Sequence, residues 1–138
     1  MKWIRKPKRG NPEAQLHKAA ADYLDRILPP KSWWTTIPAG GGGRIRGAIL
    51  KRLGYQAGTP DLLICFAGKA HFIELKAKQG RLSAEQVGQM EALNEASVPV
   101  EVCRSITDIG LALSRWQIPT REAEVSLGRR IHAAGMTA

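Results

Sequence analysis

Apolar residues recur at intervals of three and four in four segments of the chain, a spacing typical of helices with one buried face. The first segment follows Asn11, a favourable N-cap, and has Pro12 in its first turn. The second has Ile45, Ile49 and Leu53 at four-residue spacing. The pattern predicts helices over residues 12–28, 44–53, 83–96 and 105–116.

Four other segments are short, apolar and bounded by turn residues, which is the pattern of strands. Between two of them, the run Ala67-Gly68-Lys69-Ala70 has glycine at the first central position of a two-residue type II′ turn. We therefore expect a hairpin in which Ala67 pairs with Ala70. The predicted strands span residues 32–38, 61–66, 71–77 and 98–103.

The expected turn decides which residues of the hairpin face one another. It pairs Leu63 with Glu74, and Asp61 with Lys76. Because side chains alternate along a strand, Asp61, Glu74 and Lys76 should share one face at one end of the hairpin. The opposite face should be apolar and cover the core, and it consists of Leu62, Ile64, Phe66, Ile73 and Leu75.

The order of these elements predicts an α/β fold, with a mixed β-sheet flanked by helices. The expected order is helix, strand, helix, strand, strand, helix, strand, helix. The length of 138 residues is that of one domain. We expect a basic arm over residues 1–10, a domain over residues 11–118, and a mobile tail or oligomerisation segment over residues 119–138.

The chain shows no sign of a membrane or secreted protein. No apolar run approaches the roughly 18 residues of a membrane span, and no apolar stretch follows the basic start as in a signal sequence. Cys65 and Cys103 lack the spacing of a zinc site or a disulfide framework. We expect a cytoplasmic protein with no membrane partner and with both cysteines reduced in the core.

Charge narrows the class of partner. Lys and Arg number 21 and Asp and Glu 12, so the formal net charge is +9. Residues 26–60 contain six basic residues and no acidic one. Such clustering favours a nucleic acid, because Lys and Arg displace counterions from phosphates, although a solvated basic surface would look the same. Trp33 and Trp34 could stack on bases, but alternation should send at least one into the core.

Charged residues inside a strand need an explanation, since strands are depleted in them. One explanation is a cross-strand ion pair between Asp61 and Lys76, with Glu74 in solvent. The other is a metal site, because neighbouring carboxylates repel unless a cation lies between them. Glu13, on the inward side of the first helix, could join the site or could simply complement the helix dipole. An oxygen-only donor set suits Mg²⁺ or Mn²⁺.

The sequence Gly58-Thr59-Pro60-Asp61, followed by Glu74-Leu75-Lys76, resembles the PD-(D/E)xK signature of restriction-endonuclease-like phosphodiesterases. A longer series of blocks resembles the VRR-NUC family, the virus-type replication and repair nucleases, and in particular its stand-alone phage and bacterial members. This resemblance extends over residues 11–108, and its blocks are Glu13, the glycine- and arginine-rich run 40–54, the Pro-Asp and Glu-x-Lys blocks, and residues 80–86.

The resemblance implies a restriction-endonuclease-like core with a metal centre for Mg²⁺ or Mn²⁺. Lys76 would orient the attacking water or stabilise negative charge on the phosphate. Gln86 matches a glutamine that supports the site in that family, although here it also completes a capping box with Ser83. The implied metal ligands are Glu13, Asp61, Glu74 and the backbone carbonyl of Leu75.

The resemblance also implies a function. Stand-alone members of the family resemble endonucleases that cut four-way (Holliday) DNA junctions as homodimers, here in a bacterial or phage-infected cell and without a small-molecule cofactor. A monomeric flap or nicking nuclease and a catalytically silent DNA-binding module remain as alternatives. The residues expected to contact DNA are Arg44, Arg46, Lys51, Arg52 and Lys78.

Overall fold

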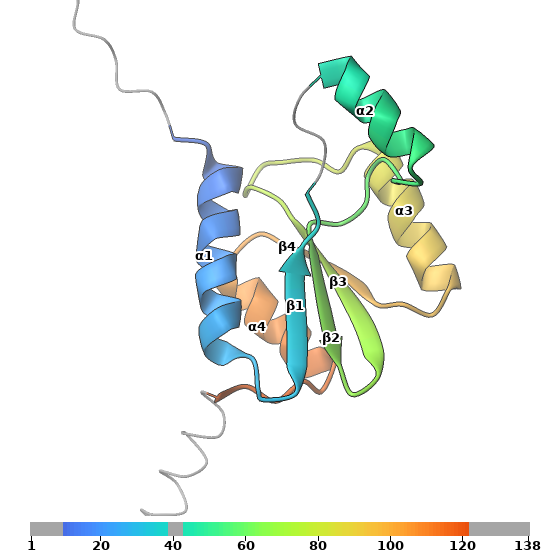
Figure 1. Ribbon diagram of the computed structural model, residues 1–138. Helices are drawn as coiled ribbons and strands as arrows, with labels where there is room; N and C mark the ends of the chain where they lie inside the picture. Colours follow the sequence, from blue (N-terminus) through green and yellow to red (C-terminus); the bar gives the residue numbers. More distant parts are fainter. Residues whose placement is uncertain (1–9, 39–42, 122–138) are drawn as a thin grey trace, which may run out of the picture.

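The computed structural model describes residues 10–38 and 43–121. In these ranges it contains helices and strands in the predicted order, with ends within about two residues of the predicted ones (Figure 1). The predicted arm and most of the predicted tail lie outside the described residues. The elements are α1 Pro12–Ile27, β1 Ser32–Thr36, α2 Gly43–Arg52, β2 Leu62–Phe66, β3 Lys69–Leu75, α3 Ala84–Glu95, β4 Val100–Cys103 and α4 Ile106–Arg115.

The four strands form one mixed sheet in the order β1-β2-β3-β4. The pairs β1–β2 and β2–β3 are antiparallel, and β3–β4 is parallel. A parallel pair needs a crossover connection, which here contains α3. The predicted α/β fold with a mixed, helix-flanked sheet is confirmed.

The core lies between the sheet and the pair of helices α1 and α4 (Figure 1). Asn11 caps α1, because its Oδ1 accepts hydrogen bonds from the backbone of Glu13 and Ala14. The predicted apolar face of the hairpin is confirmed, although Phe66 is only partly buried. The fully buried side chains of this core include Leu24, Ile27, Leu62, Ile64, Ile73, Leu75, Ile109 and Leu113.

The register of the hairpin differs from the prediction by two residues. Ala67 and Gly68 both have positive φ, at 51° and 79°, so the turn has the backbone of type I′ and Phe66 pairs with Lys69. Gly68 therefore takes the second central position of the turn. Leu63 faces Phe72, and the predicted pairing of Leu63 with Glu74 is wrong. A two-residue shift keeps the alternation of side chains, so the face assigned to Glu74 was right.

Several smaller predictions can be compared with the structure. Cys103 is buried, Cys65 is partly exposed, and both are free thiols. Trp34 packs against the core and donates from Nε1 to Asp25, whereas Trp33 is 58% exposed. Within the described ranges, no helix has both the length and the apolar character to span a bilayer.

Candidate active site

Three carboxylates from distant parts of the chain meet at one end of the sheet. Glu13 lies in the first turn of α1, Asp61 directly precedes β2, and Glu74 is the penultimate residue of β3. Each offers an oxygen within 4.8 Å of the others. We call these residues the acidic cluster. The corrected register, continued by one residue, places Asp61 opposite Glu74, which explains why the two meet.

Hydrogen bonds hold two of the three carboxylates in place. Oδ2 of Asp61 accepts from the backbone nitrogen of Leu75 at 2.7 Å. Oε1 of Glu74 accepts from Nε2 of Gln86 at 2.8 Å. Glu74 is only 1% exposed, whereas Glu13 is exposed on the surface of α1. The cluster therefore has a buried floor and an open side.

The environment of Glu74 disfavours its charge. Burial, together with the neighbouring charges of Asp61 and Glu13, raises the pKa of Glu74 to about 8, while Lys76 acts in the opposite direction. A bound cation would offset both the burial and the repulsion. The donor set is oxygen only, so the residues present fit a hard divalent ion such as Mg²⁺ or Mn²⁺.

Gln86 makes both contacts that its sequence position suggested. It completes the capping box of α3, since its Oε1 accepts from the backbone of Ser83 and its own backbone nitrogen donates to Oγ of Ser83. Its Nε2 is left to donate to Glu74. Capping and contact with the cluster therefore do not compete, because they use different atoms of one side chain.

Gly58 allows α3 to approach the segment that leads to Asp61. Its φ is +83°, a value that favours glycine. A Cβ at this position would overlap the backbone carbonyl of Glu85 and lie 2.6 Å from the backbone nitrogen of Gln86. The glycine of the Gly-Thr-Pro-Asp block thus brings the start of α3, and with it Gln86, against the cluster.

Lys76 is buried, with 9% exposure, and its backbone nitrogen donates to the carbonyl of Cys103. It follows Glu74 by two residues, and its positive charge acts on the Glu74 carboxylate. The loop after it is held by Arg104, whose Nη1 donates to the carbonyls of Ala77 at 2.8 Å and Gly80 at 2.6 Å. Sequence reasoning missed Arg104, because nothing in the local pattern indicates a contact across 24 residues or more.

His17 also lies beside this end of the sheet. It follows Glu13 by one helical turn, and its Nε2 lies 3.0 Å from Oγ1 of Thr36 at the end of β1. Thr36 adjoins Ile37, whose nitrogen donates to the carbonyl of Asp61. The four-residue spacing from Glu13 was the signal that could have placed His17 near the site.

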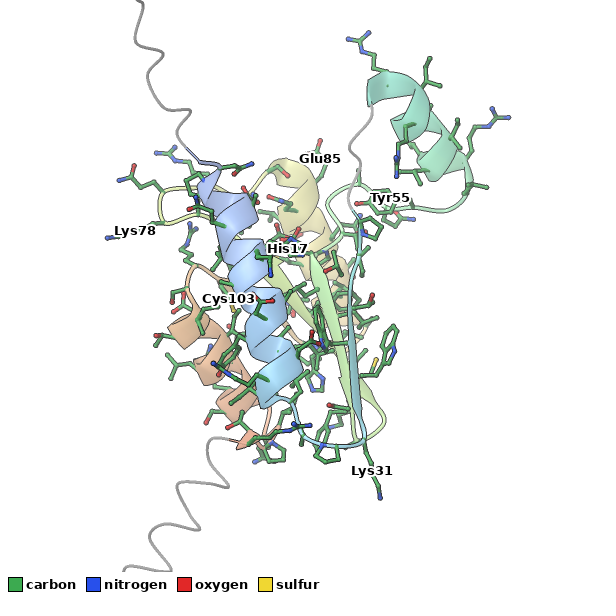
Figure 2. The ribbon with its side chains drawn as sticks, turned by 60° about the vertical axis from the view of Figure 1, so that its left-hand side comes forward. His17, Lys31, Tyr55, Lys78, Glu85 and Cys103 are labelled. Carbon is green, nitrogen blue, oxygen red and sulfur yellow. The ribbon has the colours of Figure 1, made fainter. Side chains whose placement is uncertain are left out.

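The residues predicted to contact DNA are exposed, and none of them belongs to the acidic cluster. Four of them belong to α2. Lys78 lies in the loop after β3 (Figure 2). A cavity of about 730 Å³ separates α2 from α3, and its lining includes Lys51, Tyr55 and Glu85. The four basic residues of α2 are Arg44, Arg46, Lys51 and Arg52.

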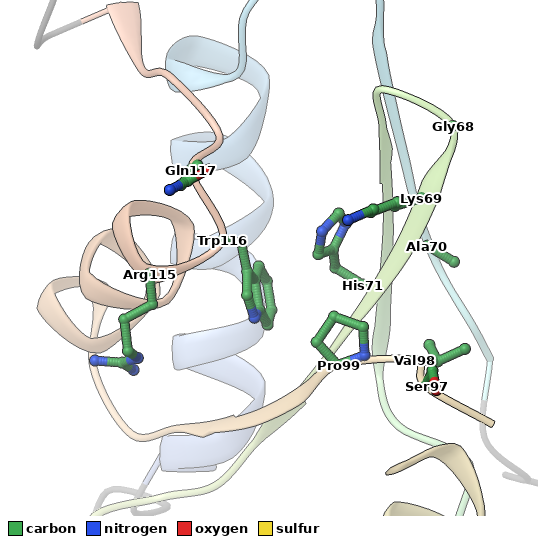
Figure 3. Close-up of a pocket in the computed structure, with 10 residues that line it drawn as sticks. All are labelled: Gly68, Lys69, Ala70, His71, Ser97, Val98, Pro99, Arg115, Trp116 and Gln117. Atoms are coloured by element: carbon green, nitrogen blue, oxygen red, sulfur yellow. The ribbon is translucent and has the colours of Figure 1, made fainter. Parts of the chain in front are cut away.

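A second cavity, of about 520 Å³, lies at the hairpin-turn end of the sheet and holds none of the predicted site residues (Figure 3). His71 and Trp116 line it, with ring centroids 4.9 Å apart. Burial lowers the pKa of His71, and its Nδ1 is hydrogen-bonded to the carbonyl of Ile64. These contacts are those of a histidine packed at the edge of the core.

Comparisons with known proteins point to one family, the VRR-NUC family. Residues 43–106 match the family model of the VRR-NUC domain, a range that includes Asp61, Glu74, Lys76 and Gln86 and that Glu13 precedes. A solved structure described as a VRR_NUC domain protein has a TM-score of 0.65 at 20% identity, over 80% of this chain and 93% of that chain. A second, described as a VRR_NUC domain, has a TM-score of 0.55 at 17% identity, over 76% and 97%.

The curated proteins give no significant match. At these identities the two solved structures show the fold, and the family model supplies the sequence pattern. The resemblance seen in the sequence is thereby confirmed: residues 43–106 match the model of the VRR-NUC domain, a nuclease domain of the PD-(D/E)xK type, and the fold is similar to that of solved VRR_NUC domain structures.

Proposed function

We propose that this protein is a metal-dependent DNA endonuclease that hydrolyses phosphodiester bonds in four-way junctions as a homodimer. The observation that carries the proposal is the convergence of Glu13, Asp61 and Glu74, with oxygens within 4.8 Å, beside the buried Lys76. The junction substrate and the two-copy enzyme rest on the family resemblance.

In this proposal Glu13, Asp61 and Glu74 hold Mg²⁺ or Mn²⁺, together with the backbone carbonyl of Leu75. The bound ion would supply Lewis acidity, polarising a phosphate and lowering the pKa of a water. Leu75 and Gln86 donate to Asp61 and Glu74 and so orient those two carboxylates. Such orientation matters because displacement at phosphorus requires the reacting groups in line.

Lys76 supplies a positive charge to the same site. Its burial means that few waters screen this charge, so it would stabilise negative charge that develops on the phosphate. Arg104 fixes the loop that follows and thereby limits the movement of Lys76. The exposed basic residues of α2, with Lys78, would attract the DNA arms.

The metal and cleavage parts of the proposal are tested with labelled four-way, flap, splayed and linear DNAs, with and without Mn²⁺. We expect Asp61→Ala and Glu74→Ala each to lose cleavage by at least about a thousandfold, equivalent to about 4 kcal/mol of barrier. Junction binding in Ca²⁺ should survive, because binding rests on the basic surface. Calorimetric titration with Mn²⁺ should show weaker binding to both variants.

Lys76→Ala should also lose cleavage but keep most of its Mn²⁺ affinity, since the lysine is not a ligand. Glu85→Ala and Lys69→Ala are matched controls, because both remove an exposed charge outside the cluster. Persistent cleavage by Glu74→Ala would contradict the assignment of the site. Cutting of flaps but not junctions would favour the flap nuclease, and binding without any cutting would favour the silent module.

A further inference from the structure

The helices α2 and α3 lie on the same side of the molecule (Figure 1). Among the helices of the described chain, these are the two without a buried residue, whereas α1 and α4 each bury three. Their outer faces therefore contribute nothing to the core.

The outer face of α2 is apolar. Ile45 is 79% exposed, Ile49 is 51% exposed, and Leu53, directly after the helix, is 78% exposed. The four-residue spacing puts these three side chains in one stripe along the helix. The other side of α2, with Gly47 and Leu50, lines the cavity against α3, so the stripe faces away from the molecule. A contiguous apolar ridge of this kind marks an interaction surface.

The charges of the two helices are opposite. Arg46 and Arg52 flank the apolar stripe, and α2 has no acidic residue. In α3 the charged residues are Glu85, Glu91 and Glu95, all exposed, and there is no basic residue. The exposed side of α3 also carries two small residues, Ala84 and Ala92, which permit the close approach of another helix. Gly88, midway between them, lines the cavity against α2 of the same copy.

We infer that the stripe of α2 in one copy of the chain packs against the exposed face of α3 in a second copy, and that the reverse contact forms by two-fold symmetry. In this arrangement Arg46 and Arg52 meet Glu91 and Glu95 of the partner twice. The inference rests on the two-copy enzyme of the proposed function and names the surface where the copies meet.

A second copy fits this surface better than DNA does. The stripe itself carries no charge, and the acids of α3 would repel a phosphate backbone. The partner's α3, in contrast, offers small residues to the apolar ridge and carboxylates to the flanking arginines. Arg44 and Lys51 lie on another side of α2 and stay available to DNA.

Charge reversal tests the inference. One variant combines Arg46→Glu with Arg52→Glu, and the other combines Glu91→Arg with Glu95→Arg. Each variant alone should associate more weakly, with a dissociation constant raised by at least about tenfold, because like charges then face each other. An equimolar mixture should regain the two-copy mass, since each variant now complements the other. Analytical ultracentrifugation of the full chain, without DNA or metal, gives the masses.

The double variant Ile45→Ala with Ile49→Ala should weaken association to a similar degree, and Leu111→Ala, which truncates an exposed residue of α4, should not. Circular dichroism verifies that each variant is folded. A wild-type chain that is monomeric and still cleaves DNA would contradict the proposed interface between copies but not the proposed nuclease activity. The proposed surface would be contradicted if the wild type is a dimer and each charge-reversed variant alone also dimerises. It would likewise be contradicted if the equimolar mixture of the two variants stays monomeric. A dimeric protein that cleaves none of the DNAs would be consistent with the proposed interface but would contradict the proposed nuclease function.

Discussion

The two sides of the molecule differ in how their helices are built. The helices α1 and α4 each bury three residues against the apolar face of the sheet, whereas α2 and α3 bury none. The first side supplies the hydrophobic stabilisation of the fold. The second contributes Gln86, whose Nε2 donates to the carboxylate of Glu74. The acidic cluster joins the two, because Glu13 comes from α1 and Gln86 from α3.

This contrast predicts that stability depends on the α1–α4 side. Leu113→Ala, which truncates a fully buried residue of α4, should lower the free energy of unfolding by about 2–5 kcal/mol. Leu111→Ala is the matched control, since Leu111 is 52% exposed on the same helix and should change stability by less than about 0.5 kcal/mol. Urea denaturation measures both. If Leu113→Ala and Leu111→Ala lowered the free energy of unfolding equally, stability would not depend on the buried face of α4.

The pH dependence of the free energy of unfolding should reveal how much the buried carboxylate of Glu74 destabilises the fold when it is charged. The pKa of Glu74 is about 8 in the folded protein and 4.5 in the unfolded reference, so folding favours its protonated form. Its contribution to stability is then full below about pH 4.5 and is lost as the pH rises through about 8. In EDTA, Glu74→Gln should remove this loss, and Mn²⁺ should reduce it in the wild type. If the free energy of unfolding of the wild type and of Glu74→Gln changed with pH in the same way, the loss of stability would not come from Glu74.

Gly58→Ala should show that activity depends on the close approach of α3 to the acidic cluster. The new Cβ would meet backbone atoms of Glu85 and Gln86 at a φ of +83°, a strain of about 1–3 kcal/mol. It should also move Gln86 away from Glu74 and lower turnover. Gly68→Ala is the control, since its φ is +79° but no atom lies within 4 Å of the added Cβ. Similar losses of activity in the two variants would mean that Gly58 does not position α3.

The smallest effect is expected from the basic residues of α2. Replacing Arg44 and Lys51 with alanine should lower the slope of log affinity against log salt by about one for each phosphate contact removed. A double variant of Lys31 and Lys69 removes the same charge from exposed positions outside α2. Junction binding titrated across salt concentrations gives both slopes. A slope equal to that of the control would assign DNA contact to another surface.

The sequence by itself determined the elements of the fold. The three- and four-residue spacing of apolar positions, the caps at Asn11 and Ser83, and the glycine turns are local signals, and local signals need no knowledge of distant residues. The hairpin register was the exception. Its turn could place Gly68 at either central position, and the two choices differ by two residues.

The chemical types of the site residues were also readable, since the predicted strands 61–66 and 71–77 contained the charged residues Asp61, Glu74 and Lys76, which are unusual there. Their convergence with Glu13 was decided by the sheet register and by the packing of α1, which bring together residues 13, 61 and 74. The two contacts of Gln86 and the loop contact of Arg104 likewise depend on elements far apart in the chain.

The outer stripe of α2 marks the limit of sequence reasoning most clearly. Periodicity showed that Ile45, Ile49 and Leu53 share one face of a helix, and the helix is present. Their exposure could not be read from the pattern, because periodicity reports the direction of apolar side chains and not what covers them. Only the tertiary structure decided that the sheet packs against α1 and α4 and leaves the stripe of α2 open.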